Sequence, residues 1–356
     1  LEAQRGETHE DTLAVLLADW PALISVLEKK SEIASDDENA SIWRRIAETK
    51  MDMLDDQNGA IAAYERALEL SPDSPTTVDA LIALYEPRNE AKRLVELYQR
   101  RVELTDANDP DDQELRYELN LSAAARYEKD LGDPREAINV LCLALEAKPG
   151  DGKVLAALER LYRSEKMWDE LLSNLKQQAA AADSREARVK LRTAIGDLHA
   201  GELTSPSEAI AEYRLVLDDE PANPHAIDAV RKIGESNEEL RLDAADVLEP
   251  VLRSAGRYED LIAALELRLR AQSEPSDRAR TLRAIATAFD EQLKQPEGAE
   301  NALLRALDDT PDDASLHDEI ERVCAQIGSA SAWSRYCDKL GERAAALDSL
   351  ERARQA

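Results

Sequence analysis

The chain has 356 residues, of which 43% are hydrophobic and only 4% aromatic, with a single Phe. This composition excludes a disordered tail, disfavours a β-sandwich and suits helices that pack through small and aliphatic residues. The 74 acidic and 45 basic residues give a formal net charge of −29, which argues against nucleic acid or anionic membrane as a partner, and no apolar run approaches the ~20 residues that span a bilayer.

The N-terminal residues, LEAQR, include neither a Met nor an apolar signal core. We therefore expect a piece of a longer protein whose native N-terminus is missing, so the compartment stays open and the cytoplasm is only the default expectation. The three cysteines, Cys142, Cys324 and Cys337, form no CxxC pair and lie in apolar helical stretches. This pattern predicts buried free thiols.

One predicted helix recurs along the chain. Its pattern is Ala, a hydrophobic residue, Tyr or Leu at i+4, a small residue at i+7, Leu at i+8 and Pro at i+12. The copies begin at Ala60, Ala137, Ala209 and Ala299, at intervals of 77, 72 and 90 residues (60 to 137, 137 to 209, 209 to 299). These spacings place the small residues on one helix face, where a neighbouring helix can approach closely, and the Pro ends the helix. Glu300 departs from the hydrophobic position in the last copy.

Another helix precedes each of these copies. It contains two adjacent residues, the first of which stands fourteen residues before the Ala that begins the copy. The second of the two is a small residue: Ala47, Ala124, Gly196 or Ala286. The turns between the two helices carry helix-start signals. Asp133 and Ser205 each precede a Pro and stand three residues before a Glu, which predicts that both cap the following helix.

A second type of hairpin alternates with the first. Its anchors are followed three residues later by Leu or Tyr: Trp20, Ala91, Trp168, Tyr258 and Trp333. An apolar helix ends six residues before each of the last four anchors. Each super-repeat therefore holds four helices, or two hairpins of ~36–40 residues, which is the size of the units in helical-repeat solenoids.

These residues resemble the tetratricopeptide repeat (TPR) family, whose second helix reads A-x-x-x-F/Y-x-x-A-x-x-x-x-P. Ala60, Tyr64, Ala67 and Pro72 match this pattern in full, and the copy at 137–149 matches it with Leu in place of the aromatic residue. The spacing from the small residue to the next Ala is one residue longer than in the family. The resemblance covers almost the whole chain and looks most like the long, mostly uncharacterised TPR-like arrays of bacterial proteins.

The resemblance implies an all-α, TPR-like α-solenoid of antiparallel helix hairpins that form a right-handed superhelix. We expect residues 1–356 to form a single solenoid of about nine hairpins, whose second helices start near residues 20, 59, 91, 134, 168, 206, 258, 296 and 333. The third interval is the longest, and its excess falls at 236–252. We predict an added helix or a pitch change there, with Pro250 kinking the helix that contains it. The alternative is a tolerated insertion without a role.

Residues that carry chemistry are scattered. The 12 glycines form no phosphate-binding loop. The four histidines stand alone, without metal-ligand spacing: His9, His199, His225 and His317. The acidic run at 106–112 fails as a calcium loop, because Tyr117 stands where the bidentate Glu belongs. We therefore predict no catalytic residue, no metal site and no cofactor, and hence a protein that is not an enzyme.

Arginines recur on the predicted first helices. Arg116, Arg188 and Arg278 each stand seven residues before the small-residue pair, and Asn39 takes this place in the first copy. Further candidates on the same helices are Arg44, Arg126 and Arg192. First helices line the concave groove of TPR-like proteins, so the resemblance implies a basic ladder that would bind acidic groups of a partner. The alternative is a set of solvated arginines paired with glutamates at i, i+4.

The resulting prediction is a protein–protein interaction scaffold that binds peptide or helix segments of other proteins in the concave groove. Two alternatives stay open: an architectural spacer of a giant repeat protein, and a regulatory domain that binds a small ligand. A polar, Arg-lined face would favour the scaffold, a groove filled by its own side chains the spacer, and a closed pocket with convergent polar groups the ligand-binding domain. The oligomeric state is not predicted.

Overall fold

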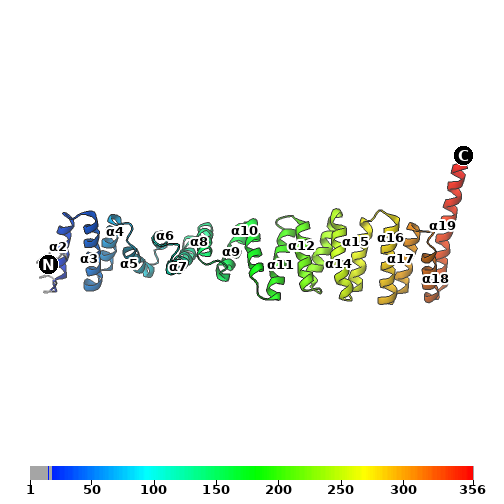
Figure 1. Cartoon of the computed structure of the whole chain (residues 1–356), viewed down its shortest axis with the longest axis horizontal. Helices are drawn as coiled ribbons and strands as arrows, with labels where there is room; N and C mark the ends of the chain where they lie inside the picture. The colour runs from blue at the N-terminus through cyan, green and yellow to red at the C-terminus, as the bar shows by residue number, and fades with distance from the viewer. Residues whose placement is uncertain (1–14, 16–17, 356) are drawn as a thin grey trace. The chain divides into compact units, whose positions relative to one another are not determined.

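The described part of the chain is built from helices alone. The computed structural model describes residue 15 and residues 18–355, apart from the side chains of residue 37 and residues 346–355, and no strand occurs among them. Successive helices pair with their neighbours in the chain (Figure 1). The prediction of an all-α, TPR-like solenoid of helix hairpins is confirmed, and the handedness of the superhelix stays a prediction.

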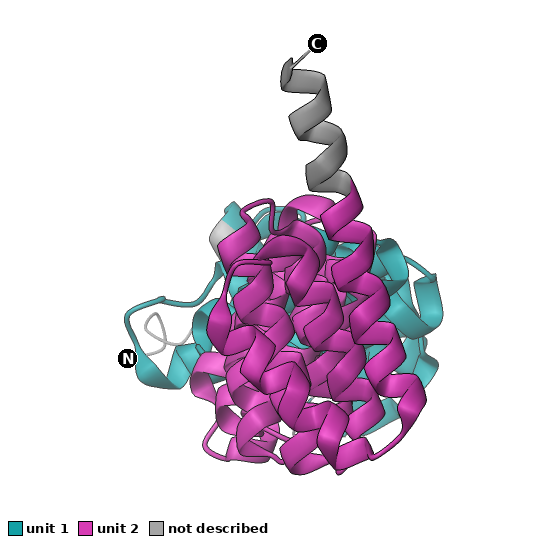
Figure 2. Cartoon of the chain, turned by 90° about the vertical axis from the view of Figure 1, so that its right-hand side faces the viewer, with its two compact units in different colours: residues 1–174 teal, residues 175–356 magenta. Residues whose placement is uncertain are grey.

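Two compact units divide the chain, Leu1–Asn174 and Leu175–Ala356 (Figure 2). The helices of unit 1 are α2 (Trp20–Ser31), α3 (Asp36–Leu54), α4 (Gln57–Leu70), α5 (Pro75–Tyr85), η2 (Glu86–Arg88), α6 (Ala91–Glu103), α7 (Pro110–Arg126), η3 (Tyr127–Leu131), α8 (Pro134–Ala147) and α9 (Gly152–Glu165). The boundary falls inside α10 (Trp168–Ala181). The first helices of this unit are α3, α5, α7 and α9. The second helices α4, α6 and α8 follow the first three of them in the chain.

Unit 2 continues the same alternation. Its helices are α11 (Arg185–Ala200), α12 (Pro206–Asp219), α13 (Pro224–Ser236), η4 (Glu238–Leu240), α14 (Arg241–Ser254), α15 (Tyr258–Ala271), α16 (Pro275–Thr287), η5 (Ala288–Gln292), α17 (Pro296–Asp309), α18 (Ala314–Ile327) and α19 (Ala330–Gln355). The first helices here are α11, α13, α16 and α18, and the second helices are α12, α15, α17 and α19, while α14 is an additional helix that packs against both α13 and α15. The single solenoid and the number of hairpins stay predictions.

Short polar side chains set several helix N-termini. The Asp133 carboxylate accepts a hydrogen bond from the Glu136 amide at 3.2 Å, and Pro134 occupies the first turn of α8, as predicted. Ser205 also stands at an N-cap, but its side chain makes no capping bond. The hydroxyl donates to the Leu203 carbonyl at 3.2 Å, because the turn before α12 brings that carbonyl within reach. The predicted cap at Ser205 is therefore wrong.

The small residue of each first helix is a close-packing site. Ala47, Ala124 and Ala286 are buried. A Cβ on Gly196 would lie 2.7 Å from Cε1 of Tyr213, a residue that is itself only 1% exposed. The Tyr213 ring of α12 thus lies directly on the backbone of α11, which is why this position takes Gly.

A wide turn between the first and second helix absorbs the extra residue of these repeats. In the first copy Asp55 adopts a left-handed φ of 52°, and the Asp56 amide donates to the Lys50 carbonyl, six residues back, at 2.9 Å. The other copies repeat this bond from Asp133 to Tyr127, from Ser205 to His199 and from Gln295 to Phe289. A left-handed residue precedes each donor there as well: Gly132, Thr204 and Lys294. The bond spans one residue more than the six-to-one bond of an ordinary helix end.

The long third interval contains a complete helix. α14 lies between α13 and α15 and stays helical through Pro250 to Ser254. Gly234 of α13 packs against it, because a Cβ there would lie 2.7 Å from the Cβ of Ala244. The residues between the end of α13 and the start of α15 thus add a packed element to unit 2.

The cysteines differ in burial. Cys324 is buried, Cys142 is half-buried and Cys337 is exposed, and all three are free thiols. The prediction of buried thiols is therefore wrong for Cys337, which lies on an exposed part of α19.

Candidate functional site

The predicted ladder arginines of unit 2 contact their own chain. Arg278 of α16 donates to Asp309 at the end of α17, at 3.0 Å. Arg188 and Arg192 of α11 share Asp219 at the end of α12, with nitrogen–oxygen distances of 3.8 and 3.6 Å. These three arginines tie a first helix to the end of the second helix that follows it.

Arg116 differs from the other ladder residues. It donates to the Thr105 hydroxyl at 3.0 Å and to the Val102 carbonyl at 3.4 Å, both at the end of α6. At the position in unit 1 that is equivalent to Asp219 and Asp309, the chain has Ala147 at the end of α8. Arg116 therefore has neutral partners and no ion pair within the described residues.

The remaining two candidates also have partners in unit 1. Arg44 of α3 donates to the Thr76 hydroxyl of α5 at 3.3 Å. Arg126 of α7 donates to Asn89 and pairs with Asp130 at 3.1 Å. Of the six candidates only Arg126 has an ion-pair partner at i, i+4 within the described residues, and that partner is an Asp. Pairing with glutamates at i, i+4, the alternative to the ladder, is thus not what the structure shows. A partner-binding role for the six arginines stays a prediction.

Ion pairs also join successive first helices, a feature that our sequence analysis did not identify. In unit 1 Arg160 of α9 holds both oxygens of Glu128, 32 residues earlier, at 2.6 and 2.7 Å. In unit 2 Arg322 of α18 pairs with Asp290, also 32 residues earlier, at 2.9 Å. The two pairs occupy equivalent positions of the repeat. A search of the sequence for an acidic and a basic residue at this fixed spacing in each copy would have identified both pairs.

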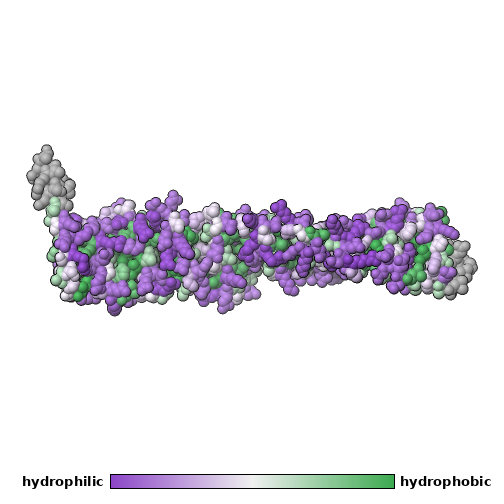
Figure 3. Space-filling model, turned by 180° about the vertical axis from the view of Figure 1, so that it is seen from behind, coloured by the Kyte–Doolittle hydropathy of each residue, from purple (hydrophilic) through white to green (hydrophobic). Residues whose placement is uncertain are grey.

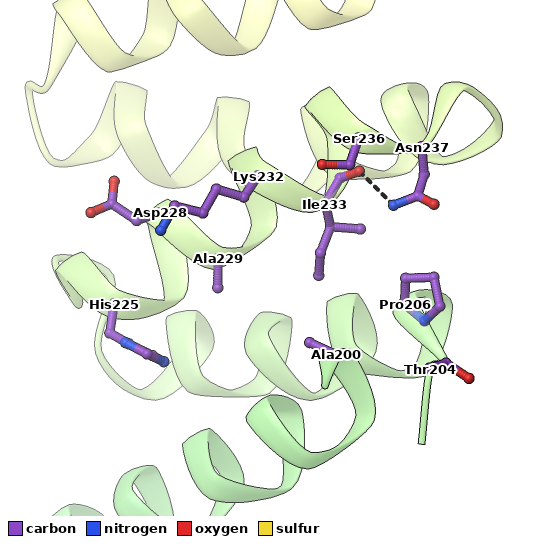
Figure 4. A pocket seen from close by; sticks show the side chains of 10 residues that line it. All are labelled: Ala200, Thr204, Pro206, His225, Asp228, Ala229, Lys232, Ile233, Ser236 and Asn237. Atoms are coloured by element: carbon purple, nitrogen blue, oxygen red, sulfur yellow. Dashed lines mark hydrogen bonds between the residues drawn. The ribbon is translucent and has the colours of Figure 1, made fainter. Parts of the chain in front are cut away.

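The first super-repeat has Met51 and Ala83 at these positions, and the third super-repeat also lacks the pair. Its equivalent positions hold Ala200 at the end of α11 and Lys232 in α13. A recess of about 590 Å³ opens beside the two residues, a volume typical of ligand pockets (Figure 4). Pro206 and Ile233 contribute apolar walls, and Asn237 closes one end with its amide bonded to the Ile233 carbonyl at 3.0 Å.

The carboxylates around the recess are already engaged. Asp197 lies 2.6 Å from Nε2 of His225, and Asp228 pairs with Arg231. Lys232 has no ion pair within the described residues, and in Figure 4 its side chain runs along α13 above Ala229. The recess therefore presents one ammonium group without a bound carboxylate.

Tyr213 fixes one of these carboxylates. Its hydroxyl donates to Asp197 at 2.6 Å. Burial, followed by the bond to Asp197, raises the pKa of Tyr213, so the hydroxyl keeps its proton and remains a donor. The position of Asp197, and through it that of His225, is set by the buried core of the hairpin.

A recess of about 450 Å³ in unit 1 offers a contrast. It lies along α4 and α6, where Arg93 pairs with Glu65 at 3.0 Å and with Glu96 at 2.9 Å. Tyr85 donates to Glu65 at 2.7 Å, and burial together with this carboxylate raises the pKa of Tyr85 to about 12. The charges of that recess are bridged by the protein's own side chains.

Sites for other chemistry do not stand out. Within residues 18–345 we find no cluster of three or more His, Cys, Asp or Glu side chains that could hold a metal ion. None of the described helices is both long and apolar enough to cross a membrane. On the face in Figure 3, hydrophilic side chains predominate and hydrophobic ones form separate small patches.

The comparisons with known proteins found similarity among solved structures alone. No family model and no curated protein matches the chain. Among solved structures, YrrB, described as a TPR protein with an unusual peptide-binding site, is 19% identical over 57% of this chain and 96% of its own, with a TM-score of 0.29. MamA is 18% identical over 51% and 91%, with a TM-score of 0.28. A tetratricopeptide repeat protein from Parabacteroides merdae ATCC 43184 is 14% identical over 72% and 96%, with a TM-score of 0.28.

Proposed function

We propose that this TPR-like helical-repeat protein is an interaction scaffold that binds a peptide or helix segment of another protein along its first helices. The observation that carries the proposal is the recess at Ala200 and Lys232, where the ion pair found in two other super-repeats is missing. A face that only spaces other domains would not need a recess whose cation lacks an ion pair within the described residues. The proposal assigns the chain no catalytic role.

The spacer alternative has its own support in unit 1. There Glu128 and Arg160 fill the equivalent position with a bridge of the protein's own side chains. The Asp290–Arg322 pair fills the equivalent position between α16 and α18 in the same way. We therefore place binding at the recess between α11 and α13, and we expect the first helices joined by these bridges to contribute less.

The proposal is tested by site-specific photo-crosslinking after capture of partners from a lysate. A photoreactive residue is placed at Glu235 of α13, next in sequence to Ser236 of the recess, or at Ala156 of α9, and both positions are exposed on first helices. The matched controls are Leu143 of α8 and Leu215 of α12, which are exposed on second helices at 42% and 38%. We expect crosslinked polypeptides at Glu235 above all and none at the control positions. Crosslinks confined to the second helices would contradict the proposal.

The basic ladder remains a separate proposal. Reversal of Arg116, Arg188 and Arg278 to Glu should remove a captured partner if these side chains bind it. Because the same arginines hold intramolecular contacts, Tm of the variant must be measured alongside. Retention of every partner by a folded variant would refute the ladder.

A further inference from the structure

We propose that the recess between α11 and α13 receives an acidic side chain, Glu or Asp, from an extended peptide segment of the partner. This inference deepens the proposed function, on which it rests, and names the chemistry that one site would recognise.

The first step of the argument is the repeat itself. Positions related by the repeat intervals hold Glu128 with Arg160 in unit 1, and Asp290 with Arg322 in unit 2. In both super-repeats a carboxylate lies between successive first helices and is held by a cation of the later one. At the corresponding place beside α13, the cation is kept as Lys232 and the carboxylate is reduced to Ala200.

The second step is the space that this substitution leaves. Ala200 faces the recess from the end of α11, opposite α13 (Figure 4). A Glu side chain here would occupy the recess as Glu128 occupies its own site. An incoming carboxylate can therefore take the place of the missing one without displacing any side chain.

The third step is charge. Asp228 pairs with Arg231, which Asp260 shares at 3.1 Å. Asp197 contacts His225 and Tyr213, and none of these carboxylates forms an ion pair with Lys232 among the described residues. A carboxylate gains a charge-assisted hydrogen bond from the ammonium group, whereas a cationic guest would be repelled. The guest is a segment of a chain rather than a free acid, because the recess is larger than a carboxylate needs and its Ile233 and Pro206 walls are apolar.

The test is a selection of phage-displayed random twelve-residue peptides on the wild-type chain, followed by affinities of the synthesised winners. We expect an acidic residue at one fixed position of the selected peptides. Replacing that residue with its amide, or Lys232 with Ala, should weaken binding by about tenfold, the effect of one charge-assisted hydrogen bond. Lys232→Arg should retain binding.

The decisive variant is Ala200→Glu, which rebuilds the internal carboxylate of the second and fourth super-repeats. We expect it to abolish peptide binding while the far-UV spectrum and Tm are kept, and Ala200→Gln, of equal size without the charge, to bind more tightly than Ala200→Glu. N-acetylglutamate amide serves as the free-acid probe, and we expect it to compete only weakly.

Three outcomes would overturn the inference. They are selected peptides that bind folded Ala200→Glu as well as wild type, a selection that yields no peptide, and N-acetylglutamate amide binding as tightly as the peptides. The first outcome leaves the scaffold proposal standing with its site elsewhere. Failure of the scaffold itself would show as absent crosslinks on the first helices.

Discussion

Asn120 of α7 illustrates how a single residue can limit the stability of a repeat. It is only 3% exposed, and its Nδ2 meets no hydrogen-bond partner among the described residues. The repeat intervals align it with Trp43, Arg192 and Leu282. An amide donor that loses water and gains no partner costs about 1–3 kcal/mol.

We predict that Asn120→Leu stabilises the protein. Leu has the same branched shape as Asn, with two methyl groups in place of the amide oxygen and nitrogen, and Leu282 is fully buried at the equivalent position of unit 2. The expected gain is about 1 kcal/mol, seen as a rise in Tm of roughly 2–4 °C by calorimetry. Asn120→Ala is the control, because it removes the amide but leaves a cavity. A lower Tm for Asn120→Leu than for wild type would contradict the prediction.

His199 of α11 is a second residue with an unsatisfied atom. It is 7% exposed, its Nδ1 lacks a hydrogen-bond partner in the described part of the chain, and its Nε2 is not seen in an ion pair. Burial lowers its pKa below the usual 6.5, and Lys176 adds to this, although Glu212 and Glu208 oppose it.

We predict that His199 makes the protein less stable in mild acid. Because its pKa is lower in the folded than in the unfolded chain, the unfolded state binds more protons below pH 6.5, and stability is lost as the pH falls through that value. The slope from one such group is at most about 1.4 kcal/mol per pH unit. The measurement is urea unfolding from pH 7.5 to 5.5 for wild type and for His199→Phe, which copies Phe289 at the equivalent position. Parallel stability curves would contradict the prediction.

At the scale of the helices, some contacts between helices are ion pairs that the hydrophobic periodicity of the sequence does not predict. Glu300 of α17 is 1% exposed, yet it stands where the other copies have Ile61, Ile138 and Ile210. Arg335 of α19 binds it, with Nε donating to Oε1 at 2.8 Å. In the sequence Glu300 is only a break in the pattern, because the residue that explains it lies 35 positions later.

We predict that Arg335→Met lowers Tm by several degrees, since it leaves a buried carboxylate unpaired. Adding Glu300→Ile should recover most of the loss, because a buried pair can be replaced by apolar residues that fit. Arg343→Met, on the same helix and paired with the almost fully exposed Asp312, is the control and should change Tm little. An equal loss for Arg335→Met and Arg343→Met would show that the buried pair holds α19 no better than a surface pair does.

The difference between local and long-range interactions explains how much of the structure could be predicted from the sequence. The helices and their close-packing sites were predicted well, since Ala, Gly and Pro act locally through helix geometry. The ion-pair partners of the arginines were not predicted. Arg278 and Arg188 stand at a regular spacing, but they bind Asp309 and Asp219, about thirty residues away. The recess at Lys232 could be found only by comparing two positions 32 residues apart in every copy.

At the scale of the whole molecule, the charge of −29 has to be reconciled with many ion pairs between helices. Exposed pairs contribute about 0–1 kcal/mol each, whereas Arg335 binds the buried carboxylate of Glu300 and Arg160 the partly buried carboxylate of Glu128. Acidic residues outnumber basic ones by 29, and the excess carboxylates repel one another over about 10 Å at 0.1 M salt. We therefore expect the repulsion between carboxylates to be larger than the attraction within the exposed ion pairs, which is the attraction that salt screens.

We predict that Tm rises as KCl is increased from 10 to 200 mM at pH 7.5. Salt in this range screens the repulsion between unpaired carboxylates, whereas the partly buried pairs are screened much less. The measurement is thermal unfolding followed by circular dichroism, with NaCl replacing KCl to show that ionic strength rather than a bound cation is responsible. Arg160→Gln is the companion variant: it removes the bridge to Glu128 and adds one net negative charge, so its Tm should rise more steeply with salt than that of wild type. A Tm that falls with salt would show that attraction between the paired side chains, and not repulsion among the others, dominates the electrostatics of the chain.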